Sequence, residues 1–202
     1  MSEKDFLYYG RYAPLLEQAE TFILTNINQI MEDLSEETGQ TPAEHIKSRI
    51  KSSASMQEKL KKKGFPTDAR SALKHVSDAV GIRIVTHFAG DIYTIEERLR
   101  KSGAWHIIKE KDYISSPKPN GYRSLHVIIE IPFEDAELSS LRAEIQLRTI
   151  AMDCWASLEH QMRYKKGIPN THLLESELKR CADEMASTDL SMQTIRDMIQ
   201  QY

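Results

Sequence analysis

Residues 122–149 read YRSLHVIIEIPFEDAELSSLRAEIQLRT, two apolar segments joined by a polar one. The first, Tyr122–Ile131, is rich in β-branched residues, and the second, Leu141–Thr149, alternates strictly between apolar and polar side chains. Alternation with a period of two is typical of a half-buried strand. The connection Phe133–Ser140 is polar, so the stretch predicts an antiparallel pair of strands closed by this loop.

The second predicted strand has a polar face made of Arg142, Glu144, Gln146 and Arg148. Such a face commonly meets water, but it can also line a cleft in which a carboxylate binds a metal or accepts a proton. In the first predicted strand, Tyr122 and His126 share a face by the same parity. They suit core packing as well as contacts with a base and a phosphate. The residues alone leave both alternatives open.

Further upstream, the segment His45–Ser52 admits two interpretations. Residues 41–44 resemble a helix capping box with proline at the first helical position. Residues 46–51, however, alternate between basic and non-basic side chains, which is the spacing of a strand. We prefer a short strand here, followed by a helix over residues 53–63 that ends at Gly64.

This predicted strand and helix form a dense basic segment. Residues 45–63 contain seven Lys and Arg and one acid, Glu58, although the net charge of the whole chain is −3. This contrast suggests a discrete anionic ligand rather than a long polyanion, and a solvated helix face is the alternative. Within the helix, Ser55 and Lys59 are four residues apart and share a face.

A third strand is predicted over Val80–Phe88, with Arg83 inside it and Asp78 just before it. An Asp at this place commonly caps a turn, and a metal-binding role is the alternative. The sequence has no GxxxxGK[ST], GxGxxG, HExxH or GxSxG motif. A bound triphosphate would therefore be held by side-chain cations and a metal, which fits the basic segment.

Both ends of the chain, residues 1–36 and 172–202, have apolar residues every three to four positions and predict amphipathic helices. We expect these stripes in contacts between copies, and packing of both stripes on the chain's own sheet is the alternative. With the strands between them, the helices predict an α+β fold in one domain over residues 1–202.

The composition excludes several classes of protein. No apolar run approaches the ~20 residues that span a bilayer, and the N-terminus lacks the order of a signal peptide. Two cysteines, Cys154 and Cys181, are too few for a disulfide framework and have no metal-ligand spacing. We expect a cytoplasmic protein.

Four segments, in this order, resemble the RelA/SpoT-type (p)ppGpp synthetase domain. They read SRIKSSASMQEKLKKKG, SDAVGIRIVTHF, KDYISSPKPNGYRSLH and AEIQLRTIAMDCWASLEHQMRYK. The likeness covers residues 42–166, and its last two motifs look like the RelQ branch of the small synthetases. It implies a nucleotidyltransferase-like mixed sheet flanked by helices, and transfer of pyrophosphate from ATP to the 3′-hydroxyl of GDP, GTP or GMP. The HD dipeptide of the family's hydrolase half is missing, so synthesis alone is expected.

The resemblance also implies roles for individual residues. Those expected to bind ATP are Arg49, Lys51, Ser55, Lys59 and Arg83, with the two arginines on either side of the adenine. Asp78 and Glu144 are expected to bind Mg²⁺, and Glu144 to accept the proton of the attacking hydroxyl. Those expected to bind the guanine nucleotide are Lys111, Lys118, Tyr122, His126, Gln146 and Asp153, with Tyr122 stacked on the base and Asp153 at its edge.

Assembly and regulation are implied as well. Members of the RelQ branch form homotetramers with a (p)ppGpp effector in a central cleft, and some bind single-stranded RNA. Here residues 44–47, before the SRIK motif, read EHIK and lack the aromatic residue expected at the effector site. A nucleotide- or RNA-binding module without catalysis is the alternative function, and it would gain nothing from paired carboxylates at Asp78 and Glu144.

Overall fold

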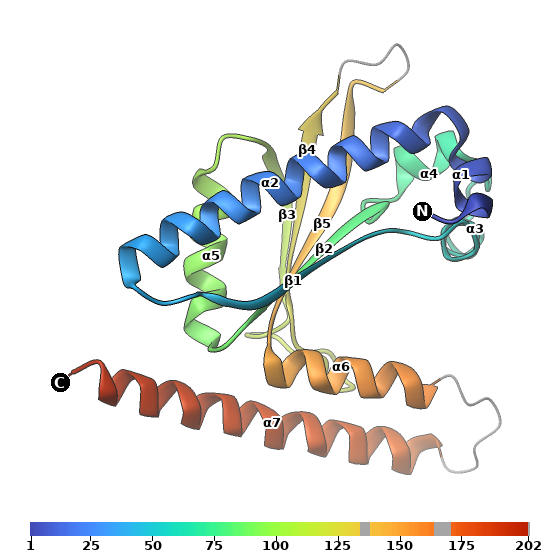
Figure 1. Ribbon diagram of the computed structural model, residues 1–202. Coiled ribbons are helices and arrows are strands. Elements are labelled where there is room, and N and C mark those ends of the chain that lie inside the picture. Colours follow the sequence, from blue (N-terminus) through green and yellow to red (C-terminus); the bar gives the residue numbers. More distant parts are fainter. Residues whose placement is uncertain (134–137, 164–170, 202) are drawn as a thin grey trace.

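A five-stranded mixed sheet lies at the centre of the computed structural model, which describes residues 1–133, 138–163 and 171–201 (Figure 1). The strands are β1 (Ala43–Ile50), β2 (Val80–Thr86), β3 (His106–Asp112), β4 (Leu125–Pro132) and β5 (Ser140–Thr149). Their order is β1-β2-β5-β4-β3; β2 and β5 run parallel, and the other neighbours run antiparallel. The predicted α+β class and mixed sheet are confirmed.

Strands β4 and β5 form the predicted antiparallel pair, with Leu125 opposite Leu147 and Pro132 opposite Ser140. The predicted start of the first strand is wrong, since β4 begins at Leu125 and Tyr122 precedes it. Tyr122 follows a turn in which the Gly121 amide donates to the Lys118 carbonyl. Of the predicted loop, residues 134–137 lie outside the described residues.

The strand interpretation of the basic segment is confirmed, since β1 is followed by helix α3 (Ser53–Lys63). Strand β1 is held by pairing with β2, which the local capping-box pattern could not reveal. The helix begins later than the capping-box pattern at residues 41–44 suggests, because the N-cap of α3 is Ser52, whose hydroxyl accepts from the Ser55 amide at 3.4 Å. Gly64 ends α3 in a left-handed conformation at φ 73°.

Strand β3 was not predicted from the sequence. It reads HIIKEKD and pairs with β4 at the edge of the sheet, where most of its side chains stay partly or fully exposed. An edge strand of this kind has little apolar alternation to detect. Two further helices occupy the connections, α4 (Ala69–His75) before β2 and α5 (Ala89–Lys101) between β2 and β3.

The N-terminal helical region is broken near its start into α1 (Glu3–Tyr9), the 3₁₀ turn η1 (Gly10–Tyr12) and α2 (Ala13–Thr38). Gly10 adopts φ 53°, and Pro14 lies in the first turn of α2, where its missing N–H costs nothing. The continuous helix that the periodicity predicts is therefore interrupted.

Helix α2 crosses one face of the sheet, and α5 lies on the same side (Figure 1). The apolar stripe of α2 is buried against the sheet, and its residues Leu16, Ile23 and Ile27 are fully inaccessible to solvent. Each such side chain contributes about 1.5–3 kcal/mol by leaving water. The expectation that this stripe mediates contacts between copies is thus wrong for the buried residues of α2, because the chain's own sheet covers them.

Helices α6 (Ile150–Arg163) and α7 (Thr171–Ile199) run side by side beyond one end of the sheet (Figure 1). The C-terminal helix prediction is confirmed. Large apolar side chains of α7 stay exposed, among them Leu190, Ile195 and Ile199. In the part of the chain that the structure describes, no helix is long and apolar enough to cross a membrane.

Candidate active site

The strand register aligns predicted site residues in two rows across the face of the sheet that α2 leaves uncovered. The first row consists of Lys47, Arg83, Gln146, His126 and Lys111. The second consists of Arg49, Gly81, Glu144 and Ile128. Residues opposite one another on neighbouring strands share a face of the sheet. Pairing thus gathers predicted site residues that lie more than 60 positions apart in the chain.

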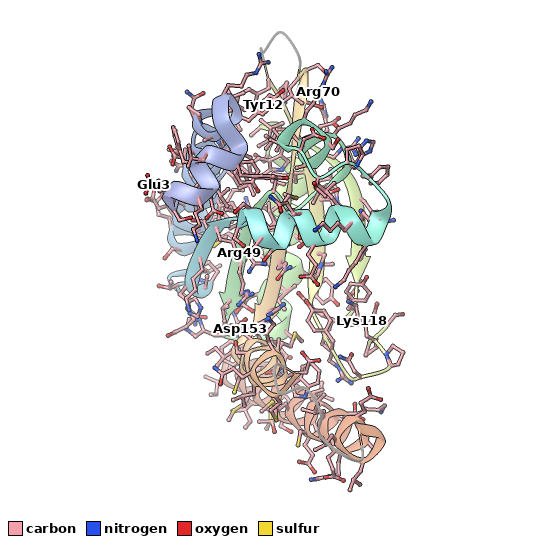
Figure 2. The ribbon with its side chains drawn as sticks, turned by 90° about the vertical axis from the view of Figure 1, so that its right-hand side faces the viewer. Glu3, Tyr12, Arg49, Arg70, Lys118 and Asp153 are labelled. Atoms are coloured by element: carbon pink, nitrogen blue, oxygen red, sulfur yellow. The ribbon has the colours of Figure 1, made fainter. Side chains whose placement is uncertain are left out.

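A cleft of about 220 Å³ opens on this face, lined by Lys47, Ser48, Arg49, Asp78, Gly81, Ile82, Arg83, Glu144 and Gln146. Gly81 lies between Arg49 and Glu144 in the second row, and its missing side chain keeps the floor of the cleft open. Figure 2 shows this face, with Arg49 on the edge strand β1, Asp153 where the sheet meets α6, and Lys118 at the right, in the loop between β3 and β4.

Asp78 lines the cleft and lies between two lysines. Its Oδ2 is 2.9 Å from the Nζ atoms of both Lys51 and Lys59. Burial alone would raise the pKa of Asp78, but the ion pairs with Lys59 and Lys51 hold it below its usual range. Its other oxygen, Oδ1, is buried without a hydrogen-bond partner among the described residues. Asp78 is therefore an ionised carboxylate with one oxygen still to be satisfied.

Glu144 faces the same cleft from β5. Its Oε1 is 3.0 Å from His126 Nδ1, and its Oε2 accepts from Gln146 Nε2 at 2.7 Å. Burial raises its pKa, yet the hydrogen bonds from His126 and Gln146 outweigh burial, and the net pKa is lowered. The nearby charge of Asp78 opposes this lowering. The two carboxylates are therefore both ionised and close enough to repel each other.

This pair fits a divalent cation. Mg²⁺ prefers carboxylate oxygens and binds proteins through one or two of them, together with the phosphates of a substrate. The buried and unpartnered Oδ1 of Asp78 is an oxygen of this kind, and Glu144 is the second carboxylate of the cleft. A cation between them would also relieve their mutual repulsion. Among the described residues, no group of three or more His, Cys, Asp or Glu could hold a metal by protein ligands alone.

The aromatic end of the site is built around Tyr122. Its hydroxyl lies 2.8 Å from His126 Nε2 and accepts from Arg148 Nη2 at 2.7 Å. Lys118 Nζ lies 4.7 Å from the centre of the Tyr122 ring and 4.6 Å from that of Tyr113. Tyr122, His126 and Lys118, all predicted for the guanine nucleotide, are thus brought together.

Asp153 projects from the first turn of α6 toward two arginines. Its Oδ1 is 3.1 Å from Arg83 Nη1 and 3.0 Å from Arg148 Nη1. Arg83 is expected at the adenine and Asp153 at the guanine, so this ion pair joins the two predicted nucleotide positions. The contact of Asp153 with the edge of the guanine stays a prediction.

Three other predicted residues are placed less directly. Ser55 lies in the first turn of α3, where it hydrogen-bonds the Ser52 hydroxyl at 3.0 Å. Lys51 and Lys59 face Asp78 rather than the open cleft. Lys111 lies on the edge strand opposite His126, and its place in the first row comes from the register alone.

Two residues of the site were given no role by the sequence reasoning. Tyr113 packs edge-on against both Tyr122 and His126, with ring centres 6.0 Å and 5.3 Å away. Arg148 contacts Tyr122 and Asp153. The alternation of residues 141–149 predicted Arg148 on the polar face of the strand, but alternation alone does not reveal its partners. No periodic signal marks Tyr113, because it lies just outside a strand.

Comparison with known proteins agrees with the motifs. A family model for the region found in RelA / SpoT proteins matches residues 48–169. The GTP pyrophosphokinase YwaC of Bacillus subtilis is 46% identical over 146 residues, which cover 72% of this chain and 70% of that protein. The GTP pyrophosphokinase YjbM of the same organism is 30% identical over 166 residues, which cover 82% of this chain and 77% of that protein.

Solved structures share the fold over nearly the whole chain. The small alarmone synthetase 2 of Bacillus subtilis has a TM-score of 0.76 at 40% identity and covers 93% of this chain and 98% of its own. The small alarmone synthetase 1 of that organism, bound to its product pppGpp, has a TM-score of 0.82 at 28% identity, with coverages of 94% and 96%. Assignment to the RelQ branch stays a prediction. The chain belongs to the RelA/SpoT family, and solved structures that it resembles over almost its full length include two small alarmone synthetases.

Proposed function

We propose that the protein is a (p)ppGpp synthetase, which transfers pyrophosphate from ATP to the 3′-hydroxyl of GDP, GTP or GMP and releases AMP. The observation that carries the proposal is the position of the two carboxylates. Asp78 and Glu144 share one cleft between a basic side, with Arg49 and Arg83, and an aromatic side, with Tyr122. A donor rich in phosphates fits the first side and a purine acceptor fits the second.

The chain's residues act mainly by placing the two nucleotides in line. Arg49 and Arg83 hold the adenine. Lys51, Ser55 and Lys59 bind the phosphates of ATP. To reach these phosphates, the two lysines leave their ion pairs with Asp78. The 3′-oxygen of the acceptor bonds to the β-phosphorus, and the bond from that phosphorus to the oxygen bridging it to the α-phosphate breaks. AMP leaves with that bridging oxygen. Positioning and neutralisation of charge dominate such transfers.

Glu144 receives the proton of the 3′-hydroxyl. Its lowered pKa keeps it ionised at neutral pH, and His126 and Gln146 fix its orientation by hydrogen bonds. A general base must lie within hydrogen-bond reach of the proton that it takes. The position of Glu144 between the basic and aromatic sides fits this requirement.

A magnesium ion held by Asp78 and Glu144 would supply neutralisation of the charge on the transferred phosphates. Asp78 Oδ1 fits such an ion best, because it is a buried carboxylate oxygen without a hydrogen-bond partner among the described residues. The relatives support nucleotides as substrates: the small alarmone synthetase 1 of Bacillus subtilis has been solved both with pppGpp and with AMPCPP.

The proposal extends to a cytoplasmic homotetramer. Helix α7 supports the assembly, since its exposed apolar residues have no cover within the described chain. Binding of a (p)ppGpp effector or of single-stranded RNA stays a prediction. Two lysines of the basic segment, Lys51 and Lys59, are engaged by Asp78, and a third, Lys62, pairs with Glu58.

The test is an analysis of products. Purified protein is incubated with ATP, Mg²⁺ and each guanine nucleotide in turn, and products are identified by mass. We expect a guanosine 3′-diphosphate species and AMP in equal amounts, with hydrolysis of added (p)ppGpp absent. Pyrophosphate or ADP as the main leaving product would contradict the proposal, and binding without turnover would support a module without catalysis.

A further inference from the structure

Arg148 is the last polar residue on the cleft face of β5, and it is 5% exposed. Burial of a guanidinium is costly unless its charge and its donors are matched by partners. The family resemblance gave this residue no role, and the proposed reaction does not use it. Its surroundings explain why a charge is retained there.

The guanidinium of Arg148 contacts three side chains assigned to the guanine nucleotide. Nη2 donates to the Tyr122 hydroxyl at 2.7 Å and to Gln146 Oε1 at 3.1 Å. Nη1 donates to Asp153 Oδ1 at 3.0 Å. The donors of an arginine point in fixed directions within one plane, so these contacts hold the three side chains at set positions relative to one another.

We propose that Arg148 is a positioning residue that builds the acceptor side of the site. The inference rests on the proposed function, since it takes Tyr122, Gln146 and Asp153 as the residues that meet guanine. Arg148 itself touches none of the reacting atoms. By holding the three side chains in place before the acceptor arrives, it lowers the entropic cost of ordering them on binding.

A chain of close polar contacts runs from Arg148 to Glu144. A guanidinium can only donate, so the Tyr122 oxygen accepts from Arg148 Nη2. The same oxygen lies 2.8 Å from His126 Nε2, and His126 Nδ1 lies 3.0 Å from Glu144 Oε1. These contacts connect the acceptor side of the site to Glu144.

Replacement of Arg148 is expected to leave the fold intact, because each partner keeps a second contact. Asp153 stays paired with Arg83, and Tyr122 stays bonded to His126. Gln146 still donates to Glu144 through Nε2, and because the residue is only half-buried, water can reach the Oε1 atom that loses Arg148. Ser124 accepts from Arg148 Nε at 3.4 Å and still donates to the Leu147 carbonyl. No fully buried partner is left without a hydrogen bond, which is the situation that costs most.

The experiment compares Arg148→Met and Arg148→Lys with the control Arg142→Met. Arg142 lies on the same face of β5, but it is exposed and pairs with Glu130. GDP affinity is measured by calorimetry without ATP, and KM values for GDP and ATP are measured in turnover. Loss of charged hydrogen bonds should weaken GDP binding about 10- to 100-fold in Arg148→Met. ATP should be affected much less, and the control should match the wild type.

Arg148→Lys should recover only part of the loss, since an ammonium cannot reach three partners in the planar arrangement of a guanidinium. Tyr122→Phe removes one of the three contacts and keeps the ring. It should weaken GDP binding less than Arg148→Met, and its effect should shrink in the double variant, because both changes break the same chain of hydrogen bonds.

Three results would overturn the inference. One is a folded Arg148→Met protein with unchanged GDP affinity. Another is an equal loss of GDP and ATP affinity, which would make Arg148 a structural residue. If Arg148→Met does not fold, Tyr122→Phe and Asp153→Asn decide, and unchanged GDP affinity in both overturns it. Failure of the proposed function would be seen in a different measurement, since the wild type would then release no AMP. Calorimetry would still report the effect of Arg148 on the affinity for GDP.

Discussion

At the scale of single residues, Glu144 distinguishes catalysis from folding. Its carboxylate accepts hydrogen bonds from His126 and Gln146 and lies in the cleft with Asp78. Glu144→Gln keeps the size of the side chain but removes its charge and most of its basicity. If Glu144 accepts the proton of the 3′-hydroxyl, AMP release should fall by about 10²-fold or more, the usual scale for a general base.

The matched control for this change is Glu130→Gln. Glu130 is a carboxylate on the neighbouring strand that pairs with exposed Arg142, away from the cleft. The Glu130→Gln variant should keep wild-type turnover, and circular dichroism should show that both variants are folded. A folded Glu144→Gln protein that retains more than about a tenth of the wild-type rate would contradict the catalytic role, given the size of effect expected of a general base.

At the scale of elements, the docking of α7 depends on polar contacts and one glycine. Arg123 donates to the Ala182 carbonyl at 3.3 Å and to Asp183 at 3.0 Å. Gly121 adopts φ 89°, and a Cβ added to it would lie 2.6 Å from the Cβ of Ala182. The loop that carries Tyr122 can therefore approach α7 only with glycine at this position, which links the helix to the acceptor side of the site.

Asp189 makes this docking dependent on pH. Burial raises its pKa, although it accepts from Thr149 Oγ1 at 2.6 Å. A carboxyl with a raised native pKa binds its proton more tightly in the folded state. Stability therefore falls as pH rises from the ordinary carboxyl value through the raised native one. Asp189→Asn should remove this cost and raise Tm at pH 7 by at most about 4 °C, and below the ordinary carboxyl pKa the advantage should disappear.

Asp183→Asn, on the same helix, should change Tm at pH 7 in the opposite direction. Hydrogen bonds from Lys179 and Arg123 lower the pKa of Asp183, so its charged form contributes stability that is present above the ordinary value and lost in acid. This variant should lower Tm at pH 7. Thermal melts of both variants between pH 3 and pH 7 check the prediction, and equal shifts in the same direction at every pH would reject it.

At the scale of the whole molecule, the exposed residues of α7 determine whether copies associate. The face of α7 toward the domain contains Ala182, Asp189 and Arg196, whereas Ile195 and Ile199 are 51% and 68% exposed. Exposed apolar groups gathered on one element commonly mark an interface. We expect a tetramer in light scattering at micromolar concentration.

The double change Ile195→Glu and Ile199→Glu tests this interface, since neither side chain supports the fold of the single chain. It should reduce the measured mass and leave the circular dichroism spectrum unchanged. Thr194→Glu, an exposed position on the same helix, is the matched control for the added charge. A wild-type protein that already has the 23.2 kDa mass of one chain would reject the assembly.

The elements that could be predicted from the amino-acid sequence are those whose pattern is local. Alternation in residues 141–149 predicted β5 and its polar face, and the basic alternation before Ser53 predicted β1 and α3. The motifs around Gly121 and Glu144 identified the family. These predictions succeeded because parity and spacing are properties of neighbouring residues in one chain segment.

Which faces of the strands and helices meet could not be predicted from the sequence and follows from the folded arrangement. Parity says that Glu144, Gln146 and Arg148 share a face, but only the pairing of β5 with β2 and β4 places Gln146 opposite Arg83 and His126. The apolar stripe of α2 likewise fits a sheet or another copy equally well, and the chain's own sheet covers it. Strand register, helix docking and the contacts of a buried charge depend on residues far apart in sequence. No local pattern encodes them, because their energies arise when distant segments come into contact.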